Sequence, residues 1–193
     1  MSDPCAVADD APATNPSITH VIFDMDGLLL DTEKFYTEVQ ENILARYNKT
    51  FEWSLKAKMM GMKAIEAARV FVEETGISGS LSAEDFLVER EDMLQNLFSS
   101  SELMPGAIRL IQHLHANGIP ISVATGFEGG PVDPRKILVF EDAPSGVLAA
   151  KNAGMWVVMV PDPRLDTGFH QTADKVISSL CDFNPSEWGL PPF

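Results

Sequence analysis

The feature that most constrains the fold is a short apolar run that ends in acidic residues, at positions 21–31. Residues 21–23 (Val-Ile-Phe) favour a strand and show no polar alternation, which is typical of a strand buried on both faces of a parallel sheet. Asp24 and Asp26 follow where this strand ends, and Gly27 allows the backbone to turn sharply. Because open α/β sheets bind ligands at the carboxyl ends of their strands, the run predicts acidic chemistry at such an edge.

Two later stretches repeat this design. A helix expected at about 107–117 leads through a glycine into a strand at 119–125, which ends in Thr125. A second apolar strand follows at 137–142 and ends in Glu141 and Asp142. Further elements expected along the chain are a helix at 144–153, a strand at 156–160, and a last strand at 175–177. This alternation predicts an α/β fold with a doubly wound, mostly parallel sheet.

The middle of the chain has helical periodicity and no convincing strand. The helices expected in this part of the chain cover residues 33–47, 54–60, 63–75 and 82–98. Ser82, followed by Asp85 three residues later, resembles a capping box at the start of the last helix. We therefore expect a small all-helical domain at 37–100, inserted into a core formed by 18–36 and 101–193. Residues 1–17 are rich in Ala, Pro and Asp and are expected to form a disordered leader.

The charge of the chain limits its partners. The formal net charge is −14, which argues against binding to nucleic acid or to an anionic membrane, and no apolar run approaches the length of a membrane span. An acidic protein that handles anionic substrates needs a metal ion. The leader contains no lysine or arginine and so matches neither a signal peptide nor a basic transit peptide. We expect a cytoplasmic monomer, with a plastid location left open.

The acidic motifs resemble those of the haloacid dehalogenase-like hydrolases. The stretch Phe23-Asp-Met-Asp-Gly-Leu-Leu-Leu-Asp31 is similar to the first motif of that superfamily, Thr125 to the second, and Val139-Phe-Glu-Asp142 to the fourth. The helical insertion matches the cap domain of the superfamily. The stretch from Phe140 to Gly154 and the carboxyl terminus resemble the glycerol-3-phosphatases, a family related to the pseudouridine-5'-phosphatases. The resemblance extends over nearly all of the chain from Thr19 onward.

The resemblance implies a phosphatase mechanism. Asp24 is expected to attack phosphorus and form an aspartyl-phosphate, and Asp26 to act as the general acid and base. Mg²⁺ is expected to bind the Asp24 carboxylate, the Asp26 carbonyl and Asp142, with Glu141 close by. In the same way, the Thr125 side chain and the Gly126 amide are expected to hold the phosphoryl oxygens. For the substrate contact from the cap, we expect the turn that contains Gly61, Met62 and Lys63.

One departure from the family concerns the stretch between Thr125 and Glu141. Members of the family carry roughly forty to fifty more residues there, including a strand, flanking helices and the lysine of the third motif. The link of about eleven residues that remains is shorter than an ordinary crossover, and we expect the core to lack one edge strand and its flanking helices. Without that lysine the acidic site is expected to bind a phosphate dianion poorly.

These features predict a Mg²⁺-dependent hydrolase of a small phosphorylated metabolite, with glycerol-3-phosphate as the expected substrate and with turnover impaired by the shortening. Two alternatives stay open. One is a phosphatase of a sugar or nucleoside phosphate, because cap residues choose the substrate. The other is a non-catalytic shortened isoform.

Overall fold

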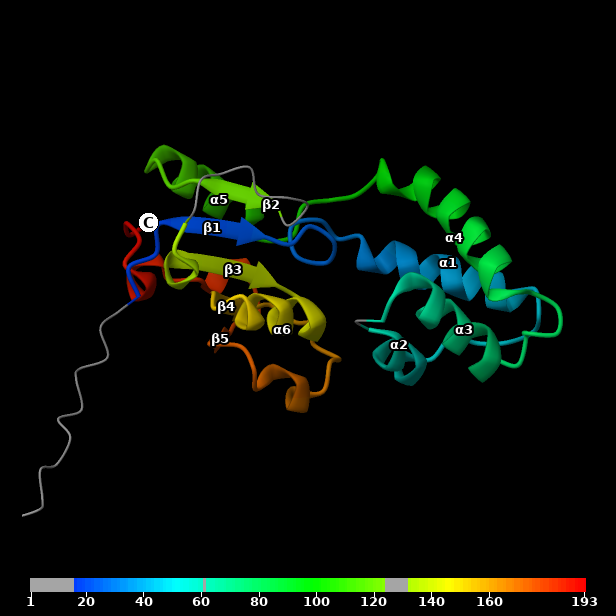
Figure 1. Ribbon diagram of the computed structural model, residues 1–193. Coiled ribbons are helices and arrows are strands. Elements are labelled where there is room, and N and C mark those ends of the chain that lie inside the picture. Colours follow the sequence, from blue (N-terminus) through cyan, green and yellow to red (C-terminus); the bar gives the residue numbers. More distant parts are fainter. Residues whose placement is uncertain (1–15, 61, 124–131) are drawn as a thin grey trace, which may run out of the picture.

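The computed structural model describes residues 16–60, 62–123 and 132–193. The predicted leader therefore lies outside the described residues, apart from its last two positions. The chain forms a five-stranded parallel sheet in the order β2-β1-β3-β4-β5 (Figure 1), which confirms the predicted α/β class. The strands are β1 (His20–Phe23), β2 (Ile121–Val123), β3 (Ile137–Glu141), β4 (Trp156–Met159) and β5 (Lys175–Val176).

The helices lie close to their predicted positions. They are α1 (Glu33–Ala45), α2 (Trp53–Met59), α3 (Ala64–Glu74), α4 (Ala83–Phe98), α5 (Ala107–Ala116) and α6 (Pro144–Asn152). The chain also contains short 3₁₀ helices: η1 (Pro134–Lys136), η2 (Thr167–His170), η3 (Leu180–Asp182) and η4 (Pro185–Trp188). At the start of α4 the Asp85 amide donates to the Ser82 hydroxyl oxygen at 3.0 Å, as the capping pattern predicts.

The sheet carries a different apolar cluster on each face. Alternate residues of β1, β3 and β4 point to one side, where they pack against α5 and the carboxyl-terminal 3₁₀ helices. The intervening residues point to the other side and pack against α6. Phe23 and Phe140 stack on the α5 side with ring centroids 5.0 Å apart. Burial on both faces accounts for the uninterrupted apolar sequence of these strands.

The described residues cover the α6 face incompletely next to β2. A groove of about 300 Å³ lies there between the sheet and α6, lined in part by Ile22, Val123 and Val139. β2 forms one edge of the sheet, and Val123 is 37% exposed. An open stretch of apolar sheet surface is what the short link between β2 and β3 predicts.

Helices α1–α4 form a helical unit with an apolar cluster of its own. Within it, Phe71 of α3 stacks on Phe86 of α4 with ring centroids 4.2 Å apart. The strands point their carboxyl ends toward this unit (Figure 1). Helix α1 runs without interruption across the expected boundary at residues 36 and 37. The division into a core and a cap stays a prediction.

Candidate active site

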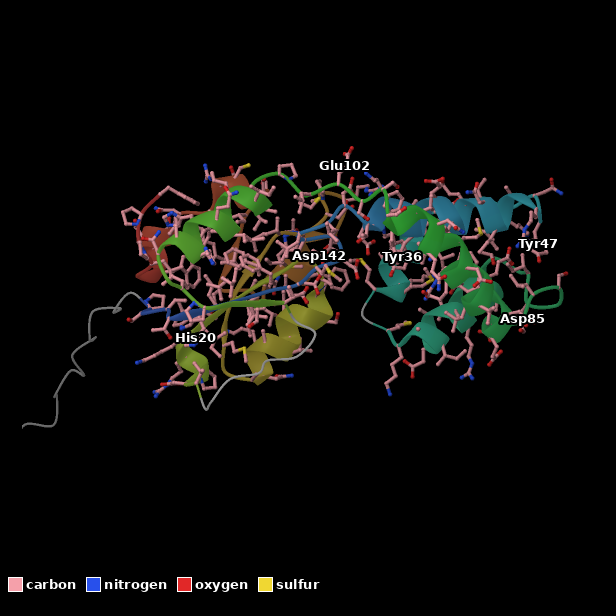
Figure 2. The ribbon with its side chains drawn as sticks, turned by 90° about the horizontal axis from the view of Figure 1, so that it is seen from above. His20, Tyr36, Tyr47, Asp85, Glu102 and Asp142 are labelled. Atoms are coloured by element: carbon pink, nitrogen blue, oxygen red, sulfur yellow. The ribbon has the colours of Figure 1, made fainter. Side chains whose placement is uncertain are left out.

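The ends of β1 and β3 bring three carboxylates together. Parallel pairing places Phe23 opposite Phe140, so the residues that follow these two lie at the same edge of the sheet. The Asp24 amide donates to the Phe140 carbonyl oxygen at 2.9 Å. Asp24, Glu141 and Asp142 each offer an oxygen atom, and these atoms all lie within 4.8 Å of one another. Figure 2 shows Asp142 at the end of the sheet that faces the helical unit, and Tyr36 of α1 in the part of the helical unit that faces the sheet.

These carboxylates line a cavity of about 510 Å³ between the sheet and the helical unit. Its lining residues are Asp24, Asp26, Glu33, Met60, Met62, Glu141, Asp142, Ala143 and Ser145. The cavity therefore joins the acidic strand ends to the loop that follows α2.

A tight loop after β1 sets the position of Asp26. The Gly27 amide donates to the Leu30 carbonyl oxygen at 2.9 Å, and Gly27 has a φ of +86°, which L side chains rarely adopt. The buried hydroxyl of Thr32 donates to Asp26 Oδ1 at 2.8 Å. Although Thr32 occupies the cap position of α1, its side chain makes no cap hydrogen bond there. It orients Asp26 instead.

Glu141 is held where a helix approaches it closely. Its Oε2 accepts a hydrogen bond from the Ala143 amide at 3.0 Å. A Cβ atom on Gly146 of α6 would collide with the Glu141 carboxylate, so this place in the helix requires glycine while the carboxylate keeps its position. The absence of a side chain at Gly146 therefore allows the Glu141 carboxylate to occupy its position at the site.

The carboxylates raise one another's pKa values. Burial, followed by the charge of Asp26, raises the pKa of Asp24 to about 6. Burial is also the largest cause at Glu141, where the pKa is about 7, and at Asp142, where it is about 8. At Asp142 the next causes are the charges of Glu141 and Glu33. Without a cation, the cavity is an unfavourable place for so many ionised groups.

The donor set fits a hard divalent cation. Mg²⁺ prefers oxygen ligands, and three carboxylates that share a small space and repel one another provide such ligands together with a reason to bind positive charge. Asp24, Glu141 and Asp142 are the side chains that would hold it. Of the four expected metal residues, Asp26 lies outside this group of three side chains, and its role through a backbone carbonyl stays a prediction.

The remaining predicted site residues differ in where they lie relative to the cavity. Thr125, Gly126 and Gly61 lie outside the described residues. Met62 lines the cavity, together with Met60. Lys63 is exposed, immediately precedes α3 and is not among the lining residues.

Sequence reasoning missed three residues that shape the site. Glu33 lines the cavity, Thr32 orients Asp26, and Gly146 makes room for Glu141. A glycine inside a predicted helix was a usable signal for Gly146, since it carries a cost in helix propensity. The roles of Thr32 and Glu33 depend on how the chain folds back after β1.

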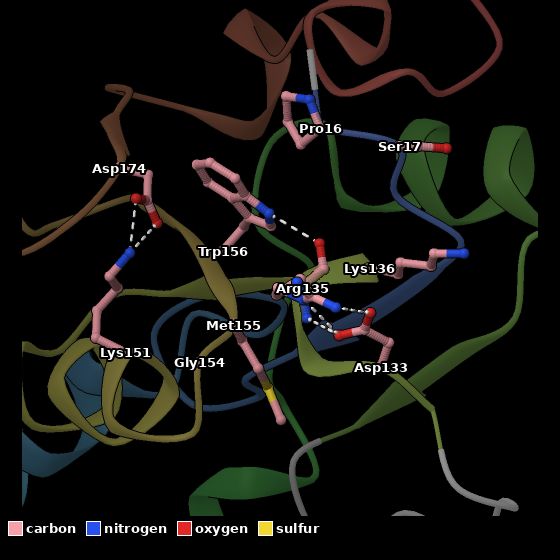
Figure 3. Close-up of a pocket in the computed structure, with 10 residues that line it drawn as sticks. All are labelled: Pro16, Ser17, Asp133, Arg135, Lys136, Lys151, Gly154, Met155, Trp156 and Asp174. Atoms are coloured by element: carbon pink, nitrogen blue, oxygen red, sulfur yellow. Dashed lines mark hydrogen bonds and ion pairs between the residues drawn. The ribbon is translucent and has the colours of Figure 1, made fainter. Parts of the chain in front are cut away.

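A further cavity, of about 620 Å³, lies at the other end of the sheet (Figure 3). Four of the five charged residues that line it form ion pairs: Arg135 pairs with Asp133 at 2.9 Å, and Lys151 pairs with Asp174 at 2.7 Å. The second of these carboxylates also accepts the Val157 amide at 2.8 Å. These acids are occupied by their partners, and we place the functional site at the acidic cavity instead.

Comparison with known proteins identifies the family of the chain. The family model of haloacid dehalogenase-like hydrolases matches residues 18–132, which include the motif after β1. The chain belongs to the haloacid dehalogenase-like hydrolases. It is 61% identical to (DL)-glycerol-3-phosphatase 2 of Arabidopsis thaliana, over 100% of this chain and 98% of that protein. It is 37% identical to a probable pseudouridine-5'-phosphatase of Drosophila melanogaster, over 91% of this chain and 96% of that protein.

Family membership, together with the similarity to two glycerol-3-phosphatases, makes this chain a phosphatase. The alignment with the first Arabidopsis relative spans 240 positions, whereas this chain has 193 residues, all of them aligned. The difference, 240 minus 193, leaves 47 aligned positions of the relative without a counterpart here. This number agrees with the expected shortening.

Solved structures support the fold. The TM-score is 0.70 with CbbY of Rhodobacter sphaeroides, at 17% identity over 90% of this chain and 100% of that one. With β-phosphoglucomutase of Clostridium difficile it is 0.66, at 18% identity over 84% of this chain and 92% of that one. Among the described residues, none of the helices has the length and apolar character needed to cross a membrane.

Proposed function

We propose that this haloacid dehalogenase-like hydrolase is a Mg²⁺-dependent phosphomonoesterase that acts on glycerol-3-phosphate through an aspartyl-phosphate on Asp24. The observation that carries the proposal is the convergence of Asp24, Glu141 and Asp142 beside Asp26, in a chain 61% identical to a (DL)-glycerol-3-phosphatase. Mg²⁺ would supply Lewis-acid stabilisation of the charge on the phosphoryl group.

The positions of the described site residues support a role for each of them. Asp24 is the nucleophile, because it directly follows β1 and lines the cavity. Asp26 donates a proton to the leaving alkoxide and then removes one from the attacking water, and the Thr32 hydroxyl keeps its carboxylate in place. Asp142 and Glu141 would hold the cation together with Asp24. Thr125 and Gly126 bind phosphoryl oxygens in this proposal.

The helical unit acts as the cap and selects the leaving group. Met62 lines the cavity from the loop after α2, and Lys63 is placed nearby in sequence. We propose a monomer in the cytoplasm, although one relative, 59% identical over 100% of this chain and 82% of its own length, is described as mitochondrial. Because the chain lacks a counterpart to 47 positions of its relative, we propose that turnover is lower than that of the longer enzyme.

The test is release of phosphate by the purified chain from glycerol-3-phosphate, pseudouridine-5'-phosphate and a hexose phosphate, with Mg²⁺ and with a chelator. We expect slow hydrolysis that is fastest with glycerol-3-phosphate and is lost with the chelator and in Asp24→Asn. Asp133→Asn, at the far end of the sheet, is the matched control and should keep full activity. Hydrolysis that survives Asp24→Asn contradicts the nucleophile. Turnover equal to that of the longer relative contradicts the impairment, and a preference for another ester favours the sugar- or nucleoside-phosphate alternative.

A further inference from the structure

The acidic cavity contains an imbalance of charge. Five of the residues that line it are carboxylic acids: Asp24, Asp26, Glu33, Glu141 and Asp142. Within the described part of the chain, no lysine or arginine lines this cavity. A phosphate monoester brings further negative charge, so the site needs cations beyond its own lining. One cation that contacts a lining residue comes from the helical unit.

Lys56 of α2 provides this contact. Its ammonium group lies 2.6 Å from Glu33 Oε2 and donates to Thr37 Oγ1 at 3.2 Å. The Lys56 side chain is 9% exposed, whereas that of Glu33 is 35% exposed. Glu33 therefore lies between the buried ammonium group and the cavity. A lysine is rarely this buried unless a carboxylate pairs with it.

Contacts between Trp53 and Arg164 fix the helix that carries Lys56 against the sheet. The ammonium group also lies 5.1 Å from the centroid of the Trp53 ring, one turn earlier in α2. The Trp53 indole donates to the Arg164 carbonyl oxygen at 3.0 Å, and the Arg164 guanidinium lies over the same ring at 4.1 Å. Arg164 follows β4, so these contacts attach α2 to the carboxyl-terminal side of the sheet.

We propose that Lys56 is a positioning residue that supplies positive charge to the acidic cavity from behind Glu33. It acts through the Glu33 carboxylate and does not touch the reacting atoms. This inference rests on the proposed function of the same cavity. A buried positive charge at this place favours an anion in the cavity and opposes a cation there, because the sign of the interaction reverses with the sign of the ligand.

This reversal of sign provides the test. Lys56→Gln removes the charge, so it should weaken binding of orthovanadate at saturating Mg²⁺ and strengthen binding of Mg²⁺ alone, each by roughly threefold to tenfold. Glu33→Gln should do the opposite for both ligands. Lys56→Arg keeps the charge and should restore both affinities toward those of the unmodified chain. Calorimetry on the full chain measures both ligands without requiring turnover.

Lys58→Gln is the matched control, since Lys58 lies on the same helix and pairs with Glu74 at 2.8 Å, where both side chains are about half exposed. It should change neither affinity. Shifts of opposite sign in Lys56→Gln support the inference, and so does the reversed pair of shifts in Glu33→Gln. Loss of both affinities together in Lys56→Gln, or unchanged affinities, overturns it and indicates a merely structural lysine.

The two proposals fail in different ways. Opposite shifts in a chain that hydrolyses no ester leave the role of Lys56 intact and contradict the proposed activity. Hydrolysis that Asp24→Asn abolishes, with affinities that do not respond to Lys56→Gln, leaves the activity intact and contradicts the role of Lys56. A chain that binds neither Mg²⁺ nor orthovanadate contradicts both.

Discussion

The two ends of the sheet place acidic side chains in opposite electrostatic states. At the amino-terminal end, Asp133 pairs with Arg135, whose hydrogen bond lowers the pKa of Asp133 below its ordinary value. At the carboxyl-terminal end, burial and neighbouring carboxylates raise the pKa values of Asp24 and Asp142 to about 6 and about 8. The same residue type is neutralised by an adjacent arginine at one end, whereas no lysine or arginine of the described residues lines the cavity at the other. Acids kept close together without such a partner are typical of a site that binds a metal ion.

The largest expected effect on stability is at Gly27, where the backbone lies against the Asp142 carboxylate at the carboxyl-terminal end of the sheet. Gly27→Ala places a Cβ against the Asp142 carboxylate at a φ of +86°, so we expect it to cost about 3 kcal/mol of unfolding free energy. Gly118→Ala is the control, because Gly118 has a φ of +68° and nothing within 4 Å of its added Cβ. It should cost about 1 kcal/mol, from the backbone alone. Urea denaturation measures both, and equal costs would show that the carboxylate simply moves away.

A second change separates the site from the stability of the fold. Gly146→Ala forces the Glu141 carboxylate to move, and we expect Mg²⁺ affinity to fall about tenfold, as for other residues that support metal ligands. Stability should change little, because alanine is the better helix former. Gly79→Ala, where the new Cβ meets nothing within 4 Å, should leave Mg²⁺ binding unchanged. Calorimetric titration of both variants decides whether Glu141 matters for the metal.

The pH dependence of stability tests the repulsion among the acids. The folded pKa values of Asp24, Glu141 and Asp142, about 6, 7 and 8, lie above the ordinary unfolded values near 4. The native state therefore binds more protons than the unfolded state in this range, and stability falls as pH rises from about 4 to 8. We expect the melting temperature of the metal-free protein to fall by a few degrees over this range.

Two conditions should reduce this fall. Saturating Mg²⁺ compensates the ionised carboxylates, and Asp142→Asn removes the group with the highest of the three pKa values. Thermal melts at matched ionic strength compare the three samples. A metal-free melting temperature that rises between pH 5 and pH 8 contradicts the proposed repulsion.

The smallest effect is expected at the paired end. Lys151→Gln breaks the ion pair with Asp174, whose side chain keeps its hydrogen bond from the Val157 amide. We expect a loss of about 0.5 kcal/mol of unfolding free energy, since partly exposed ion pairs contribute little. Mg²⁺ affinity should not change. A measurable loss of Mg²⁺ binding would mean that the two ends of the sheet are coupled.

Much of the fold was predictable because its signals are local. Apolar runs without alternation predicted β1, β3 and β4, and the Ser82 cap predicted the start of α4. The predicted element boundaries were less accurate. The strand expected at 119–125 is β2 at Ile121–Val123, and residues 124–131 lie outside the described residues. The acidic group was also predictable, because parallel strands bring their carboxyl ends to one edge.

The charge balance of the cavity was not predictable in this way. Sequence reasoning assigned the substrate contact from the helical unit to the turn of Gly61, Met62 and Lys63, which stays a prediction, and it did not find the buried Lys56 that contacts a lining residue. Its pairing with Glu33 joins two helices across 23 positions in sequence, and no periodicity within either helix reports it. Glu33 and Lys56 look like ordinary solvated charges until α1 and α2 pack together.

By itself, the sequence determined the class of the sheet, the family of the chain and the three carboxylates that converge, because strand patterning and chain direction fix which residues reach the same edge. Tertiary structure alone decided which charges face the cavity and which are neutralised behind it. The reason is physical: the free energy of a charge depends on its distance to other charges and on its burial, and both arise only when separate helices and strands pack.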